Sequence, residues 1–176
     1  MTRSFGLLAM MIGLLLVTGA SPARAQSGSS TSTSTHPAAE PLAELEREFF
    51  AAIREGDAKK FLSYVPEQGI NVGPRAQHVS RPEIEQQFTQ HRDLYCKLFD
   101  SSCIQIKLDV GAYVCSYREL LTRSEKVRTA ATEAVRGGVR QAILVAEVKN
   151  DQCAGIGLMD FIFNEAHGGW HLFSVP

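Results

Sequence analysis

Spacings typical of metal sites are missing from this sequence. It contains four cysteines, and no two of them are separated by the two to four residues that zinc sites commonly use. The only closely spaced histidines, His167 and His171, are interrupted by Gly168 and Gly169, so they do not form the paired ligands of one helical turn. We therefore predict no metal site and no cofactor.

Motifs of common nucleotide-binding and hydrolytic folds are absent as well. The chain has no Gly-x-Ser-x-Gly, no glycine-rich phosphate loop ending in Lys and Ser or Thr, and no Gly-x-Gly-x-x-Gly after a strand. The segment CAGIGLMD has two glycines, but it leads into a strand, whereas a dinucleotide fingerprint opens a helix. We therefore predict no dinucleotide site there.

An excess of positive charge is also missing. Without residues 1–25, which contain Arg3 and Arg24 and no acids, the chain has 16 basic and 19 acidic side chains, a formal charge of −3. Nucleic-acid-binding proteins usually carry a basic stripe, whereas here basic and acidic residues are interleaved. We predict that the protein binds no nucleic acid.

No apolar run is long enough for a membrane anchor. The N-terminal run from Leu7 to Val17 is shorter than the ~20 residues that a transmembrane helix needs. Arg3 precedes this run, and Ala23 and Ala25 form the Ala-x-Ala pattern after which signal peptidases cleave. We interpret residues 1–25 as a signal peptide, and we expect an exported protein, periplasmic or extracellular, with no stable membrane anchor.

The mature chain divides into a linker and one domain. Residues 26–40, QSGSSTSTSTHPAAE, contain no aromatic or branched aliphatic side chain and cannot offset the entropy of an ordered chain, so we predict a disordered linker. Residues 41–176 are enough for a single domain with its own core.

Helical patterns dominate the first half of this domain. PLAELEREFFAAIREGD has apolar residues at helical spacing and stops at Gly56, after which Asp57 can cap a second short helix. SRPE, beginning at Ser80, has the form of a capping box. The third helix that it opens would point Ile84, Phe88 and Tyr95 inward.

Strand patterns dominate the second half. Residues 104–110 alternate between apolar and polar side chains, and VRQAILVAEVKN, GIGLMDFIFNE and GWHLFSVP are separated by turn residues, which predicts an antiparallel meander. Residues 113–136 fit either a helix or two strands joined at Gly137-Gly138, and we favour the helix. The order of elements predicts an α+β domain in which N-terminal helices cover one face of a curved antiparallel sheet.

Four cysteines remain after export, which in an oxidising compartment predicts two disulfides. Cys96 and Cys103 flank a short turn and could close it, leaving Cys115 to join Cys153. The sequence leaves the other two pairings open. A nucleophilic thiol is the alternative, but it needs a nearby base and a lowered pKa, and neither is visible in the sequence.

Asp160 stands out among the acids. It lies between Met159 and Phe161, on the strand face that also carries Leu158 and Ile162. Such a carboxylate lies either at an edge in contact with solvent or in a pocket, where desolvation raises its pKa for proton transfer. We favour the edge.

Two further candidates accompany Asp160. Tyr117 could donate a hydrogen bond to a ligand, although a tyrosine with a buried ring and a hydrated hydroxyl needs no function to explain it. His91 falls on the inward side of the predicted third helix, where a partly buried histidine with a hydrogen-bond partner is a simpler explanation than a catalytic one.

A family resemblance follows from three segments. The helix LEREFFAAIREGDAKKFLSYV, the helix VSRPEIEQQF and the closing strand GWHLFSVP occur in an order that resembles the nuclear-transport-factor-two-like (NTF2-like) superfamily, which includes ketosteroid isomerases and SnoaL-like proteins. The resemblance covers most of residues 41–176. It implies a cone-like domain with an apolar pocket, but the acid and tyrosine pair of the isomerases has no match here, so no catalytic role is carried over.

Two functional hypotheses follow. The first is an exported, non-catalytic domain that binds a small apolar ligand or another protein, with the open sheet face available for a homodimer. The second is a lyase or isomerase that uses Asp160 as general base in an apolar pocket. The position of Asp160 relative to a cavity distinguishes them.

Overall fold

The computed structural model describes residues 39–104, 114–153 and 157–176. The predicted signal peptide, most of the predicted linker and most of the alternating segment at 104–110 lie outside these residues. The helices are α1 (Ala39–Glu55), α2 (Ala58–Ser63), α3 (Arg81–Thr89), α4 (Leu94–Phe99), the short 3-10 helix η1 (Ser101–Cys103) and α5 (Tyr117–Arg123). The strands are β1 (Ile70–Val72), β2 (Gln77–Val79), β3 (Lys126–Arg136), β4 (Val139–Lys149), β5 (Leu158–Ala166) and β6 (Gly169–Val175).

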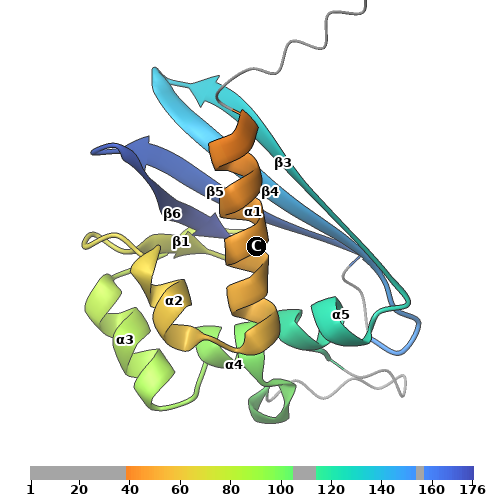
Figure 1. The fold of residues 1–176 in the computed structure, drawn as a ribbon. Helices are drawn as coiled ribbons and strands as arrows, with labels where there is room; N and C mark the ends of the chain where they lie inside the picture. Colours follow the sequence, from red (N-terminus) through yellow and green to blue (C-terminus); the bar gives the residue numbers. More distant parts are fainter. Residues whose placement is uncertain (1–38, 105–113, 154–156) are drawn as a thin grey trace, which may run out of the picture. The chain divides into compact units, whose positions relative to one another are not determined.

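The six strands form one sheet in the order β2-β1-β6-β5-β4-β3 (Figure 1). The four long strands, β3 to β6, are successive antiparallel neighbours, which confirms the predicted meander. β1 pairs antiparallel with β2 but parallel with β6. The predicted α+β class is therefore confirmed, with one correction: the sheet is mixed rather than wholly antiparallel, because β6 runs alongside the early hairpin.

The helices cover one face of the sheet, and α1 lies across the long strands (Figure 1). Alternate residues of β4 and β5 point toward the helices and are buried: Ala142, Leu144, Ala146, Val148, Met159, Phe161 and Phe163. The ring of Phe49 on α1 has its centroid 4.9 Å from that of Phe161 and 5.0 Å from that of Phe163. Burying each such ring contributes about 1.5–3 kcal/mol.

The first two helices follow the predicted pattern. α1 buries Leu45, Phe49 and Ile53 on one side, and it begins two residues before the predicted domain boundary at Pro41. Gly56, with φ of 75°, follows its last turn. The carboxylate of Asp57 then accepts a hydrogen bond from the backbone N–H of Lys60 at 2.8 Å and caps α2.

The third predicted helix is two helices. α3 ends at Thr89 and α4 begins at Leu94, because His91 and Asp93 have φ of 48° and 49° and cannot continue a right-handed helix. Ser80 has extended backbone at the start of α3, but its side chain forms no capping hydrogen bond. The capping box predicted there is therefore wrong.

The preference for a helix over residues 113–136 is correct only in part. α5 occupies Tyr117–Arg123, but Lys126–Arg136 is strand β3, which pairs with β4 along its whole length. Gly137 and Gly138, with φ of 57° and 79°, form the two-residue turn of this hairpin. The capping box of the chain is at Ser116, whose hydroxyl and backbone N–H exchange hydrogen bonds with Glu119.

Candidate functional site

Tyr117 lies at the start of α5 with its side chain buried. Its hydroxyl donates a hydrogen bond to the carbonyl oxygen of Pro176 at 3.1 Å. The Nζ of Lys97 donates to the same oxygen and lies 5.5 Å from the centroid of the Tyr117 ring. Burial, followed by the negative charge of Asp160, raises the pKa of Tyr117 above its ordinary value. The hydroxyl is therefore a hydrogen-bond donor at any physiological pH.

Asp160 lies on the other face of the sheet. It is exposed on β5, opposite Val145 of β4, whereas Met159 and Phe161 on either side of it are buried beneath the helices. The two side chains do not point into a common cavity, and fully buried aromatic rings occupy the space between α1 and the strands.

His91 is exposed in the turn between α3 and α4. The prediction of a partly buried histidine on an inward helical stripe is wrong, because the helix breaks at this residue. Its ring stacks on that of Tyr95, with centroids 4.3 Å apart and ring planes 10° apart. The three candidates, Asp160, Tyr117 and His91, therefore do not form one site.

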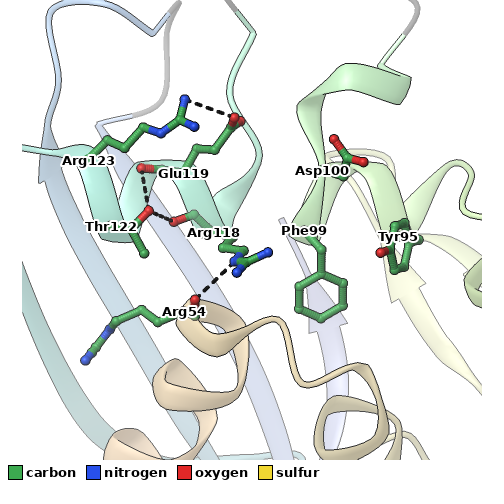
Figure 2. Close-up of a pocket in the computed structure, with 8 residues that line it drawn as sticks. All are labelled: Arg54, Tyr95, Phe99, Asp100, Arg118, Glu119, Thr122 and Arg123. Atoms are coloured by element: carbon green, nitrogen blue, oxygen red, sulfur yellow. Dashed lines mark hydrogen bonds and ion pairs between the residues drawn. The ribbon is translucent and has the colours of Figure 1, made fainter.

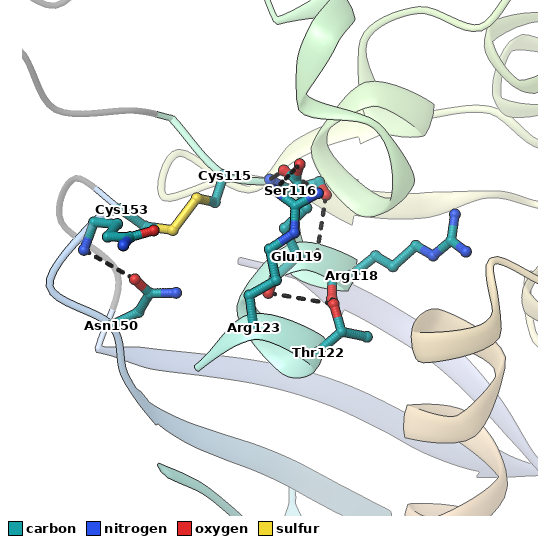
Figure 3. Close-up of a disulfide and its surroundings, with 9 residues drawn as sticks. Cys115, Ser116, Arg118, Glu119, Thr122, Arg123, Asn150 and Cys153 are labelled. Carbon is teal, nitrogen blue, oxygen red and sulfur yellow. Dashed lines mark hydrogen bonds and ion pairs between the residues drawn. A yellow bond between two sulfur atoms is a disulfide. The ribbon is translucent and has the colours of Figure 1, made fainter. Parts of the chain in front are cut away.

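The predicted two disulfides are present, and of the three pairings that the sequence leaves open they use the one in which Cys96 and Cys103 close a short turn. Cys96 is bonded to Cys103 and Cys115 to Cys153, each with Cα atoms 5.6 Å apart. The first closes the turn after α4, and the second holds the residue before Ser116, the N-cap of α5 (Figure 3). Two disulfides in a chain of this size are typical of an oxidising compartment. None of the described helices is long and apolar enough to span a membrane.

A polar cleft of about 510 Å³ lies between α4 and α5, at the C-terminal end of α1 (Figure 2). Its lining residues are Arg54, Tyr95, Phe99, Asp100, Arg118, Glu119, Thr122 and Arg123. The sequence pattern does not reveal this cleft, because Arg54 and Arg118 are 64 residues apart. They meet only through the packing of α5 against the end of α1.

A second hollow, of about 720 Å³, lies along the loop between α2 and β1 and the β5–β6 hairpin. Val139, Leu172 and Phe173 give it apolar lining, and His78, His167 and His171 also line it. Within residues 39–104, 114–153 and 157–176, no group of three or more His, Cys, Asp or Glu side chains is arranged to hold a metal ion.

The sheet face that points away from the helices carries many apolar side chains; we call it the outer face. On this face Ile143 of β4 is opposite Ile162 of β5, and both are half-buried. Leu158 is 58% exposed, and Val139 and Phe173 are each 40% exposed. Lys126, Arg128, Glu147 and Lys149 are the charged side chains near one end of β3 and β4 on this face, and Asp160 lies among its apolar residues, opposite Val145.

Comparisons with known proteins give only structural neighbours. No family model matches the chain, and no curated protein matches it. A variant of Rd1NTF2_05 aligns with a TM-score of 0.44 and 11% identity, covering 78% of this chain and 96% of that one. An NTF2-like protein from Cytophaga hutchinsonii aligns with a TM-score of 0.42 and 8% identity, covering 77% and 93%.

Proposed function

We propose that this chain is an exported, non-catalytic domain that forms a homodimer through the outer face of its sheet. The observation that carries the proposal is the exposure of Leu158, Val139 and Phe173 on that face. Leu158 and Val139 lie toward opposite ends of this face, and the half-buried pair Ile143 and Ile162 lies between them. Large exposed apolar patches on soluble proteins mark interaction sites. A second copy presents the same apolar surface and would cover it.

The charges on the outer face fit a second copy. β3 contributes Lys126 and Arg128, while β5 contributes Asp160, and β4 lies between these two strands. Arg128 is 4.0 Å from Glu147 of its own chain, and both side chains are exposed enough for Arg128 to change partner. A two-fold arrangement that exchanges β3 and β5 brings the basic strand of each copy over the acidic residue of the other. Opposite charges that meet across an interface fix its orientation and disfavour other partners.

The positions of the polar candidates support a non-catalytic role. A lyase or isomerase with Asp160 as general base needs this carboxylate within hydrogen-bond reach of a substrate that is also held by a donor such as Tyr117. Asp160 is exposed on the outer face, and the Tyr117 ring is buried beneath the helices. The hydroxyl of Tyr117 already donates to Pro176.

Export is supported by two independent features. The first is the leader pattern ending at Ala25, and the second is the pair of disulfides, which persist in an oxidising compartment. The proposed mature chain begins at Gln26. A small apolar ligand is a second proposal, and the hollow lined by Val139, Leu172 and Phe173 is the place that suits it.

One preparation tests export and association together. The full-length gene is expressed with its leader, the exported fraction is recovered, and its N-terminal residue and mass are measured by native mass spectrometry. We expect a chain beginning at Gln26, two disulfides and a dimer mass. An uncleaved chain with free thiols inside the cell would contradict export, and retained ligand would appear as added mass.

Charge exchange tests the interface itself. We expect Asp160→Arg to weaken the dimer at least tenfold in sedimentation experiments and the double variant Asp160→Arg with Arg128→Asp to restore part of the affinity. Leu158→Lys should give a folded monomer, because Leu158 is 58% exposed in the isolated chain. Lys59→Glu is the matched control. Lys59 is an exposed residue of α2, away from the outer face, so this variant should leave the dimer intact. A monomeric wild-type chain at 100 μM would refute the proposal.

A further inference from the structure

Arg118 is the best-positioned cation of the cleft between α4 and α5. Its Nε donates a hydrogen bond to the carbonyl oxygen of Arg54 at 3.2 Å. Its guanidinium also lies against Gly56, since a Cβ added to that glycine would be 3.2 Å from both Cζ and Nη1 of Arg118. The end of α1 therefore fixes the guanidinium through its backbone, and the guanidinium points from α5 toward the α4 side of the cleft (Figure 2).

The acidic side chains of the cleft already have other partners. The carboxylate of Glu119 accepts hydrogen bonds from the backbone N–H and hydroxyl of Ser116 and pairs with Arg123 at 3.2 Å. Asp100 accepts from the backbone N–H of Ser102 at 2.9 Å, and its hydrogen bonds with Ser102 and, to a smaller extent, the nearby charge of Arg118 lower its pKa. Among the residues that the structure describes, no carboxylate forms an ion pair with Arg118, which leaves its terminal nitrogens available for an anion.

The cleft is lined in part by aromatic side chains, and a disulfide lies next to each of its two sides. Phe99, on the α4 side of the cleft across from Arg118 on α5 (Figure 2), is 4% exposed, and its ring centroid is 5.5 Å from that of Tyr95. The disulfide Cys96–Cys103 closes the turn that follows Phe99. Cys115, bonded to Cys153, precedes the N-cap of α5. Both walls are therefore held in place before a ligand arrives, which lowers the entropy cost of binding.

We propose that this cleft binds a small organic carboxylate, with the Arg118 guanidinium holding the carboxylate and the half-buried side chain of Tyr95 contacting an apolar part of the molecule. A planar guanidinium matches a carboxylate with two parallel hydrogen bonds, which a lysine ammonium does not reproduce. The cleft is separate from the outer face of the sheet, so binding here does not depend on the proposed homodimer.

Titration with benzoate tests the site, because this probe joins a carboxylate to an aromatic ring. Benzamide, which is neutral and has nearly the same shape, is the matched ligand. In two-dimensional NMR spectra of the disulfide-bonded protein, we expect benzoate to shift the signals of Arg118, Phe99 and Thr122 in a saturable way. Benzamide should cause no such shift at equal concentration.

Three variants distinguish specific binding of benzoate at Arg118 from nonspecific attraction of an anion to positive charge. Arg118→Gln should weaken benzoate binding tenfold or more, and Arg118→Lys should weaken it by several fold while keeping the charge. Arg75→Gln removes an exposed arginine from the turn between β1 and β2 and should leave binding unchanged. Equal binding by wild type and Arg118→Lys, equal shifts with benzamide, or an equal loss in Arg75→Gln would each overturn the proposal. Arg118→Lys keeps the test decisive if Arg118→Gln does not fold.

Discussion

The hydroxyl of Tyr117 donates a hydrogen bond at 3.1 Å to the carbonyl oxygen of Pro176, 59 residues later in the chain. Lys97 from α4 donates to the same oxygen. One carbonyl group after the last strand thus joins two helices to the sheet. Burial lowers the pKa of Lys97, because desolvation disfavours its charged form. Buried polar groups are usually hydrogen-bonded, and here the Tyr117 hydroxyl and the Lys97 ammonium both donate to Pro176.

We expect Tyr117→Phe to lower the free energy of unfolding by about 1 kcal/mol, because it removes the hydrogen bond but keeps the buried ring. The loss stays small since Lys97 still donates to Pro176. Urea denaturation measures it. Tyr95→Phe is the control, because the hydroxyl of Tyr95 has no hydrogen bond within the described residues, and it should change stability by less than about 0.5 kcal/mol. Equal losses in the two variants would contradict the role given to the Tyr117 hydroxyl.

Gly69 and Gly73 separate two costs of adding a side chain. Both have positive φ, 92° and 75°, but a Cβ on Gly69 would lie 2.1 Å from the carbonyl oxygen of Val79, whereas nothing lies within 4 Å at Gly73. We expect Gly73→Ala to cost about 1–2 kcal/mol from backbone strain alone. Gly69→Ala must also displace the backbone of β2 and should cost more than about 4 kcal/mol or prevent folding.

Thermal denaturation of the two alanine variants checks this difference. Similar melting temperatures would mean that the loop before β1 is free to move away from Val79, contrary to the close approach found here.

The two disulfides should contribute unequally. Cys96 and Cys103 are separated by 7 positions and Cys115 and Cys153 by 38. Loop-closure entropy predicts stabilisation of about 2 kcal/mol for the shorter loop and about 4 kcal/mol for the longer one. We therefore expect the double variant Cys115→Ser, Cys153→Ser to lose more stability in urea than Cys96→Ser, Cys103→Ser. The opposite order would show that local packing around each disulfide, rather than loop length, determines how much it stabilises the fold.

The parts of the fold that sequence could predict are those governed by local periodicity. The faces of α1 and β4 follow directly from the spacing of residues such as Phe49 and Leu144, and the short separation of Cys96 from Cys103 favoured their pairing. Residues 126–136 are harder to predict, because β3 is an edge strand with three alanines and four charged residues, and pairing with β4 rather than its own propensity makes it a strand.

The candidate sites show the same limit. The apolar neighbours of Asp160 in the sequence make it a candidate, but only the sheet register shows that its side chain lies on the outer face. The cleft around Arg118 depends on a contact between α5 and the end of α1, which no local pattern encodes. Long-range packing therefore determines which polar residues come together. It keeps the three candidates from the sequence, Asp160, Tyr117 and His91, apart.

The capping box at Ser116 gives the domain a defined acid sensitivity. Burial opposes ionisation of Glu119, but hydrogen bonds from Ser101 and Ser116 outweigh it and hold the pKa of Glu119 below its usual value. Because the folded-state pKa is lower than the unfolded-state pKa, the ionised carboxylate stabilises the fold above the unfolded-state value. This stabilisation is lost as the pH falls through the folded-state pKa.

We expect Glu119→Gln to lower the free energy of unfolding by about 0.5–1 kcal/mol at pH 7, since the amide still accepts a hydrogen bond but carries no charge for the N-terminus of α5. The difference from wild type should shrink as the pH falls through the lowered folded-state pKa of Glu119 and its carboxyl becomes protonated. Urea denaturation at pH 3, 5 and 7 measures it. Asp151→Asn, in the exposed turn after β4, is the control and should show no such trend. A difference of equal size at pH 3 and pH 7 would mean that the shape of the side chain, and not its charge, stabilises the helix.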